Sequence, residues 1–60
     1  MFIEFTNRRD EVVSLNVSQI HFVTSDSKGA VIFDLVGMDY KLKESYEDFM
    51  ARLYALLSSE

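Results

Sequence analysis

Short runs that alternate apolar and polar residues fill the first two thirds of the chain. Each run is five to seven residues long, rich in β-branched and aromatic side chains, and separated from the next by Asn, Asp, Ser or Gly. This pattern predicts β-strands, which we expect at residues 2–6, 11–15, 20–24, 30–36 and 39–43. Because connections of two to five residues join antiparallel neighbours, we expect one small antiparallel sheet of four to five strands.

The last quarter of the chain changes to a helical period. Its apolar residues fall on one face at a spacing near 3.6, namely Phe49, Met50, Leu53, Leu56 and Leu57. Ser45 followed by Asp48 fits the Asp variant of a capping box, and the acids at the start suit the helix dipole. The pattern predicts an amphipathic helix at residues 46–57, with Arg52 one turn from Asp48 and paired with it.

Together these elements predict a single α+β domain over residues 1–60, because a chain of this length has no room for a second domain. One helix covers one face of a sheet, yet the strands carry apolar residues on both faces: Val31 and Phe33 alternate with Ala30 and Ile32. A half-solvated sheet alternates more cleanly. The second apolar face therefore requires either that the sheet curls into a small barrel or that it packs on another protein surface.

The small size of the chain favours self-association. A 60-residue domain buries only about 60% of the surface of its unfolded chain, so its stability is expected to be marginal. Disulfides, metals and oligomerisation are the usual remedies. The chain has no cysteine and one histidine, His21, which excludes disulfides and the common multi-histidine metal sites. We expect no cofactor, and a homo-oligomer.

Five residues are candidates for an interface. On the sheet they are Phe22 and Ile32, and on the helix Tyr54, Ala51 and Ala55. Tyrosine is enriched at interfaces, and small residues on the polar side of a helix let a second helix or strand approach closely. The competing interpretation of the alanines is that alanine is the best helix former.

No residue pattern indicates catalysis. His21 lies within an apolar strand, where a structural or partly exposed histidine is expected rather than a general base. Gly29 and Gly37 lie in separate turns and build neither a P-loop nor a dinucleotide fingerprint. The serines lack a nucleophile-elbow context. The sequence therefore predicts a protein that is not an enzyme.

A nucleic-acid-binding regulator is the alternative class. Arg8 and Arg9 occupy the tip of the first hairpin, and Lys41 and Lys43 alternate along the last strand. A basic loop beside a sheet can contact phosphates and aromatic side chains can stack on bases. The net charge of −4 disfavours this function, and lysines on a terminal strand also serve to protect a sheet edge.

Membrane insertion and export are not expected. No apolar run approaches the roughly 20 residues that span a bilayer. The first residues do not combine a basic region with an apolar stretch, as a signal peptide does. We therefore expect a cytoplasmic protein.

Three short motifs carry a resemblance to a known family. They are Asn16 with Ile20 after the second strand, the run Gly37-Met38-Asp39-Tyr40-Lys41-Leu42, and Lys43-Glu44-Ser45 followed by Glu47 and Phe49 at the start of the helix. With the order of elements, they resemble the short FlbD-type flagellar and swarming-motility proteins, which also occur as uncharacterised bacterial and phage proteins. In the first hairpin, where that family usually carries a glycine, this chain has Asn7-Arg8-Arg9-Asp10. The sheet-rich DNA-binding domain of LytTR-type regulators is similar in element order only.

The resemblance implies a small α+β fold and a non-catalytic role, with no ligand residues to carry over. We therefore expect a protein-interaction module that self-associates through its exposed sheet face and binds another protein. A regulatory or flagellar adaptor and a phage-encoded inhibitor of a host system both fit this expectation.

Overall fold

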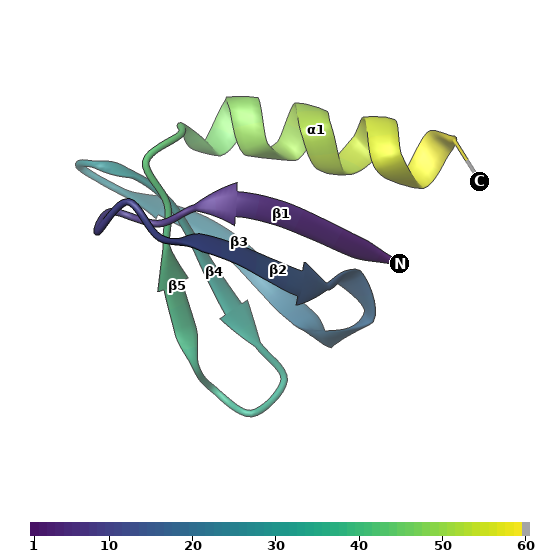
Figure 1. Ribbon diagram of the computed structural model, residues 1–60, viewed down its shortest axis with the longest axis horizontal. Coiled ribbons are helices and arrows are strands. Elements are labelled where there is room, and N and C mark those ends of the chain that lie inside the picture. Colours follow the sequence, from purple (N-terminus) through teal and green to yellow (C-terminus); the bar gives the residue numbers. More distant parts are fainter. Residues whose placement is uncertain (60) are drawn as a thin grey trace.

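The structure, a computed structural model, describes residues 1–59 as five strands, one 3₁₀ helix and one α-helix (Figure 1). The elements are β1 (Phe2–Thr6), β2 (Val12–Asn16), η1 (Val17–Gln19), β3 (Ile20–Asp26), β4 (Gly29–Asp34), β5 (Asp39–Lys41) and α1 (Tyr46–Ser58). The predicted α+β class, with strands followed by a C-terminal amphipathic helix, is confirmed.

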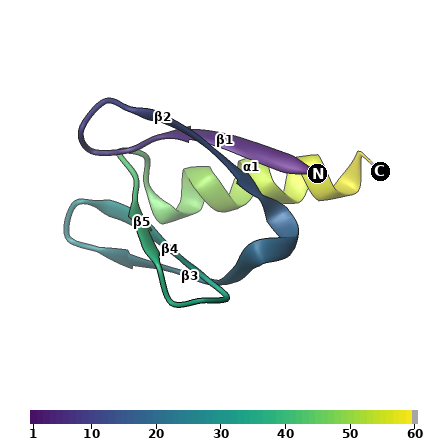
Figure 2. The ribbon, with the colours of Figure 1, turned by 60° about the horizontal axis from the view of Figure 1, so that its bottom comes forward.

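The prediction of one sheet is wrong, because the strands form two antiparallel sheets. β1 pairs with β2, and β3, β4 and β5 form a separate meander in that order. The separation arises at η1, where the side chain of Asn16 accepts a hydrogen bond from the Ser18 amide at 3.1 Å. This cap turns the chain out of β2, so that β3 begins in the second sheet instead of pairing with β2 (Figure 2).

The two sheets are pinned together at one end by the segment that follows β5. Leu42 forms an isolated antiparallel bridge with Asn7. The Lys43 amide donates to the carbonyl of Thr6 at 3.3 Å, and the Leu42 amide donates to the carbonyl of Ala30 at 2.9 Å. One short segment thus bonds to β1 and β4, and the inner faces of both sheets contribute to one core.

That core combines residues from both sheets and the helix. Its buried members are Ile3, Phe5, Leu15, Ala30, Ile32, Leu42, Phe49 and Leu53. Phe5 lies at the centre, with edge-to-face contacts to Tyr40 at 6.1 Å and to Phe49 at 6.4 Å between ring centroids. Such contacts add to the stabilisation that burial of the rings provides.

The turn of the first hairpin adopts a conformation that usually calls for glycine. Asp10 has a φ of 64°, a region that Asp and Asn tolerate better than other side chains. The side-chain oxygen of Asn7 accepts from the amides of Arg9 and Glu11, at 2.9 and 3.0 Å, and orders the turn. The hairpin is therefore well formed without a glycine.

The helix begins where the capping pattern predicts. Ser45 is the N-cap, and its hydroxyl oxygen accepts from the Asp48 amide at 3.1 Å. The predicted pair of Arg52 with Asp48 is wrong. Arg52 instead binds both carboxylate oxygens of Glu44, at 2.6 and 3.1 Å, and donates to the Glu4 carbonyl at 2.8 Å. This arginine ties the helix to β1 and to the segment before the helix.

Replacing Ser45 with alanine should lower the free energy of unfolding by about 1 kcal/mol, because the Asp48 amide loses its acceptor. Urea denaturation followed by circular dichroism measures this change. Ser27→Ala is the matched control, since it alters an exposed serine in the β3–β4 turn, away from the helix. Equal stability of Ser45→Ala and the wild type would show that this cap does not stabilise the helix.

Candidate interaction surfaces

The outer face of the second sheet carries two rows of side chains on the side away from the core, although one of them, Val31, is only 5% exposed. The first row is Phe22, Phe33 and Asp39, and the second is Thr24, Val31 and Lys41, taken in each case from β3, β4 and β5. We call these six residues the outer sheet face. The rings of Phe22 and Phe33 stack at 4.7 Å with an interplanar angle of 15°, and Phe22 remains 47% exposed. An aromatic pair on an open sheet face is typical of a contact surface.

A β-bulge in β3 decides which residues reach this face. Ile20 pairs with Asp34, and regular pairing from that point would set Phe22 opposite Ile32. The register shifts by one residue at His21, so Phe22 lies opposite Phe33 instead. The prediction of Ile32 as an interface residue is therefore wrong: Ile32 is fully buried in the core. Phe22 is exposed, as an interface residue must be.

The loop between β4 and β5 extends the apolar surface beyond the sheet. Leu35, Val36 and Met38 are exposed, with Val36 at 82%. The loop is held by the buried carboxylate of Asp34, whose Oδ1 accepts from the amides of Val36 and Met38 at 3.0 and 2.9 Å. Its Oδ2 accepts from the Tyr40 hydroxyl at 2.9 Å. A fixed loop with apolar side chains at its tip loses little conformational entropy on binding.

Hydrogen bonds set the ionisation of Asp34. Burial by itself would raise the pKa of this carboxyl, but the bonds from the Tyr40 hydroxyl and from the amides of Met38, Val36 and Gly37 outweigh burial and lower it. The same bond raises the pKa of Tyr40, since its hydroxyl donates to the carboxylate. No sequence pattern indicated this role for Asp34, because an aspartate at the end of a strand is typical of an ordinary turn.

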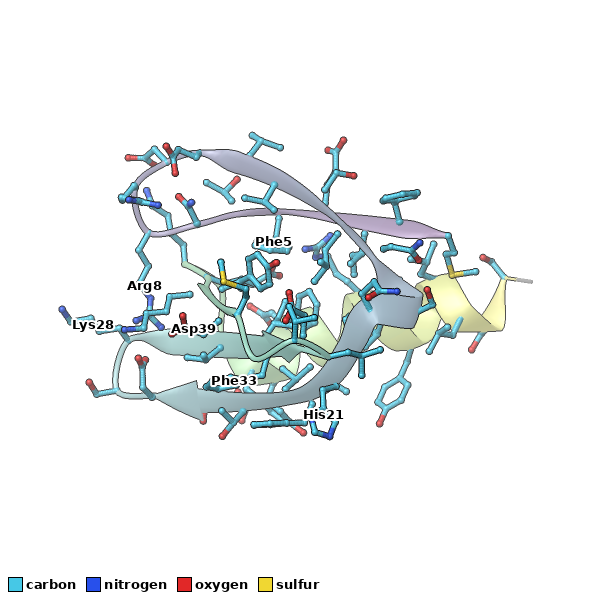
Figure 3. The ribbon with its side chains drawn as sticks, turned by 90° about the horizontal axis from the view of Figure 1, so that it is seen from below. Phe5, Arg8, His21, Lys28, Phe33 and Asp39 are labelled. Atoms are coloured by element: carbon cyan, nitrogen blue, oxygen red, sulfur yellow. The ribbon has the colours of Figure 1, made fainter. Side chains whose placement is uncertain are left out.

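Arg8 is a structural contact between the two hairpins. Its guanidinium binds both oxygens of Asp26, at 2.7 and 2.9 Å, and its Nε donates to the Leu42 carbonyl at 2.9 Å. Figure 3 shows Arg8 reaching from the first hairpin toward the turn that carries Lys28. The hydrogen bond to Arg8, with those from the Lys28 and Gly29 amides, holds the pKa of Asp26 well below its usual range. The bond to Asp26 likewise raises the pKa of Arg8.

Of the other predicted phosphate contacts, Arg9 and Lys41 line one surface pocket together with Arg8, but Glu11 and Asp39 line the same pocket, and Lys43 lies elsewhere. Arg9 lies 3.4 Å from a carboxylate oxygen of Glu11, and Lys43 forms an ion pair with Asp10. Lys41 lies on the outer sheet face, in register with Val31. Three of the four basic side chains are thus each paired with an acid, and the fourth lies in the row next to that of Asp39.

The helix residues predicted for an interface are exposed on a different side of the molecule. Tyr54 is 62% exposed, and Ala51 and Ala55 are also exposed. The helix packs through Phe49 against the core that contains Ile32, which is the inner side of β4. The structure therefore does not bring Tyr54, Ala51 and Ala55 together with Phe22.

His21 borders the outer sheet face. Its ring meets the ring of Phe22 edge to face at 5.3 Å, and the side chain is exposed (Figure 3). Among residues 1–59, no group of three or more His, Cys, Asp and Glu residues is arranged to hold a metal ion. Within the same residues, no helix is both long and apolar enough to span a membrane.

Comparisons with known proteins assign no family to the chain: no family model, no curated protein and no solved structure matches it.

Proposed function

We propose that this protein is a non-enzymatic protein-interaction module, self-associating and cytoplasmic, that acts as a regulatory adaptor or an inhibitor. The observation that supports the proposal is the stacked Phe22–Phe33 pair on the outer sheet face, with the exposed Leu35 just beyond the end of β4. Membership of the FlbD-type family remains a prediction within this proposal. The binding surface is the outer sheet face together with the β4–β5 loop.

Two other apolar areas are poorer candidates. On the outside of the first sheet, Phe2 and Val12 are exposed but lie at opposite ends, since Phe2 pairs with Asn16 and Thr6 pairs with Val12. Single exposed apolar residues are normal on protein surfaces. On the helix, Tyr54 and Leu57 are exposed, but neither belongs to a stacked aromatic pair, and the alanines beside Tyr54 contribute little contact area. The outer sheet face instead carries a stacked aromatic pair, next to an apolar loop.

Replacing Phe22 with aspartate should abolish binding of the cellular partner while the protein stays folded. Phe22 is half exposed, so a charge there has access to water in the free protein but would be buried without a counter-charge in a complex. The measurement is an affinity pull-down of tagged wild type and variant from lysate of the native host, quantified by mass spectrometry. Val12→Asp is the matched control, because Val12 is also exposed and lies on the other sheet.

The proposal expects a partner that the wild type and Val12→Asp retain and that Phe22→Asp loses, with or without nuclease treatment. Recovery of nucleic acid alone, removed by nuclease, would contradict the proposal and support the nucleic-acid-binding alternative. Retention of every partner by Phe22→Asp would show that the outer sheet face is not the binding surface.

A further inference from the structure

From the arrangement of charge on the outer sheet face, we infer that its occupant is a second copy of this chain, packed face to face about a two-fold axis that crosses the strands. The inference rests on the proposed function and specifies the partner of its surface. It follows from the positions of four residues: Phe33 and Asp39 in the first row, and Val31 and Lys41 in the second.

The face is self-complementary under one rotation. Asp39 and Lys41 are two residues apart on β5, so their side chains leave the same side of the sheet about 7 Å apart. A two-fold axis between the two rows and perpendicular to the strands exchanges the rows of the two copies. It sets Asp39 of each copy opposite Lys41 of the other. It also sets Phe33 opposite Val31, which is only 5% exposed within its own copy and so adds little contact area. In a two-fold interface each contact occurs twice in this way, once from each copy.

A dimer about the other two-fold axis in the plane of the sheet would bury a charge without a partner. A two-fold axis parallel to the strands would exchange β3 with β5, which sets Asp39 of one copy against Phe22 of the other. Burying a carboxylate against an aromatic ring without a counter-charge is costly. Neither Asp39 nor Lys41 takes part in any ion pair found within residues 1–59, so both remain available for the exchange across the first axis.

The area of the outer sheet face determines how tightly the two copies are expected to bind. A standard interface buries about 800 Å² on each partner, about a fifth of the 4004 Å² surface of this protein. Two rows across three strands cover less than that, and Leu35 at the end of β4 enlarges the contact. Facing sheets pack about 10 Å apart at an angle near 30°, which suits side chains of this length. We therefore expect a dimer with a Kd in the micromolar range.

The inference is tested by exchanging the two charges on separate chains. Asp39→Lys alone faces lysine against lysine, and Lys41→Asp alone faces aspartate against aspartate, so each variant should dimerise at least tenfold more weakly than the wild type in sedimentation equilibrium. Mixed in equal amounts, the two variants restore both ion pairs, and the mixture should form a heterodimer with an affinity near that of the wild type. Circular dichroism checks that each variant is folded.

Lys28→Asp is the control for nonspecific attraction. It carries the same net charge as Lys41→Asp, but the change lies in the β3–β4 turn away from the exchanged pair. Lys28→Asp keeps Asp39 and Lys41, so by itself it should dimerise like the wild type. Its heterodimer with Asp39→Lys would contain one like-charge contact and should not form at concentrations where the charge-exchanged mixture forms its heterodimer.

Two results would overturn the inference: a wild type that is monomeric up to millimolar concentration, or a charge-exchanged mixture that forms no more heterodimer than the control mixture. A monomeric wild type would also remove self-association from the proposed function, but either result leaves the protein-interaction role standing if Phe22→Asp still loses a partner in the pull-down. The two hypotheses therefore fail separately.

Discussion

Replacing Gly29 with alanine should unfold most of the protein. An alanine Cβ at this position would lie 2.8 Å from the Glu44 carbonyl oxygen, 2.9 Å from that of Leu42 and 3.3 Å from that of Lys43. These oxygens belong to backbone that already bonds to Ala30, so they have no freedom to move aside. The φ of 152° at Gly29 adds backbone strain.

The expected loss is about 3–5 kcal/mol, the sum of typical costs for overpacking and for a strained backbone. A 60-residue domain has a total stability of only about 3–9 kcal/mol, so thermal denaturation should show a mostly unfolded variant or a strongly lowered Tm. Gly37→Ala is the control, because Gly37 also has a positive φ, 91°, but no atom lies within 4 Å of its Cβ position. Similar Tm values for the two variants would refute the account of the joint between the sheets.

Replacing Asp34 with alanine should lower the Tm by roughly 10–20 °C, because it leaves the amides of Val36 and Met38 and the Tyr40 hydroxyl without their acceptor. Asp34→Asn should cost less, since the amide oxygen still accepts from the two backbone groups. Differential scanning calorimetry of the three proteins measures the order. An alanine variant as stable as the wild type would show that Asp34 does not hold the loop.

The lowered pKa of Asp34 makes the stability of the protein depend on pH. The pKa of Asp34 is lower in the folded state than its usual value, so its stabilising contribution is complete above the usual pKa of about 4 and disappears as the pH falls through the lowered value. Asp26 acts in the same direction through Arg8. The free energy of unfolding of Asp34→Asn should therefore fall less steeply below pH 4 than that of the wild type. Near pH 7 the difference in stability between the two proteins comes only from the changed hydrogen bonds.

Local pattern predicted the elements well because each depends on neighbouring residues. β1 matches its expected range, and the helix begins at Tyr46 after the Ser45 cap, as the capping pattern indicates. The arrangement of the sheets depended on η1, a three-residue turn that breaks the expected pairing of β2 with β3. Short polar segments between strands leave that choice to tertiary contacts, which the sequence pattern does not contain.

The candidate surface was predicted in part, and the bulge at His21 explains the difference. Phe22 was assigned to the exposed face and lies there, while Ile32 was assigned with it and lies in the core. A one-residue shift in register exchanges the faces of a strand, and nothing in the residues around His21 distinguishes a bulged strand from a regular one. The predicted role of Arg8 in binding phosphate required a guanidinium without an acidic partner. In the structure this guanidinium forms an ion pair with Asp26.

The most direct test of the central claim, that the outer sheet face is the interaction surface, is photo-crosslinking in the native host. A benzophenone side chain placed at position 22 lies on that face, and the same side chain at position 12 lies on the outside of the first sheet, where Val12 is 69% exposed. Our account predicts a discrete covalent adduct from position 22, to a second copy or to another protein, and none from position 12. Adducts from position 12 alone, or equal yields from both positions, would contradict it.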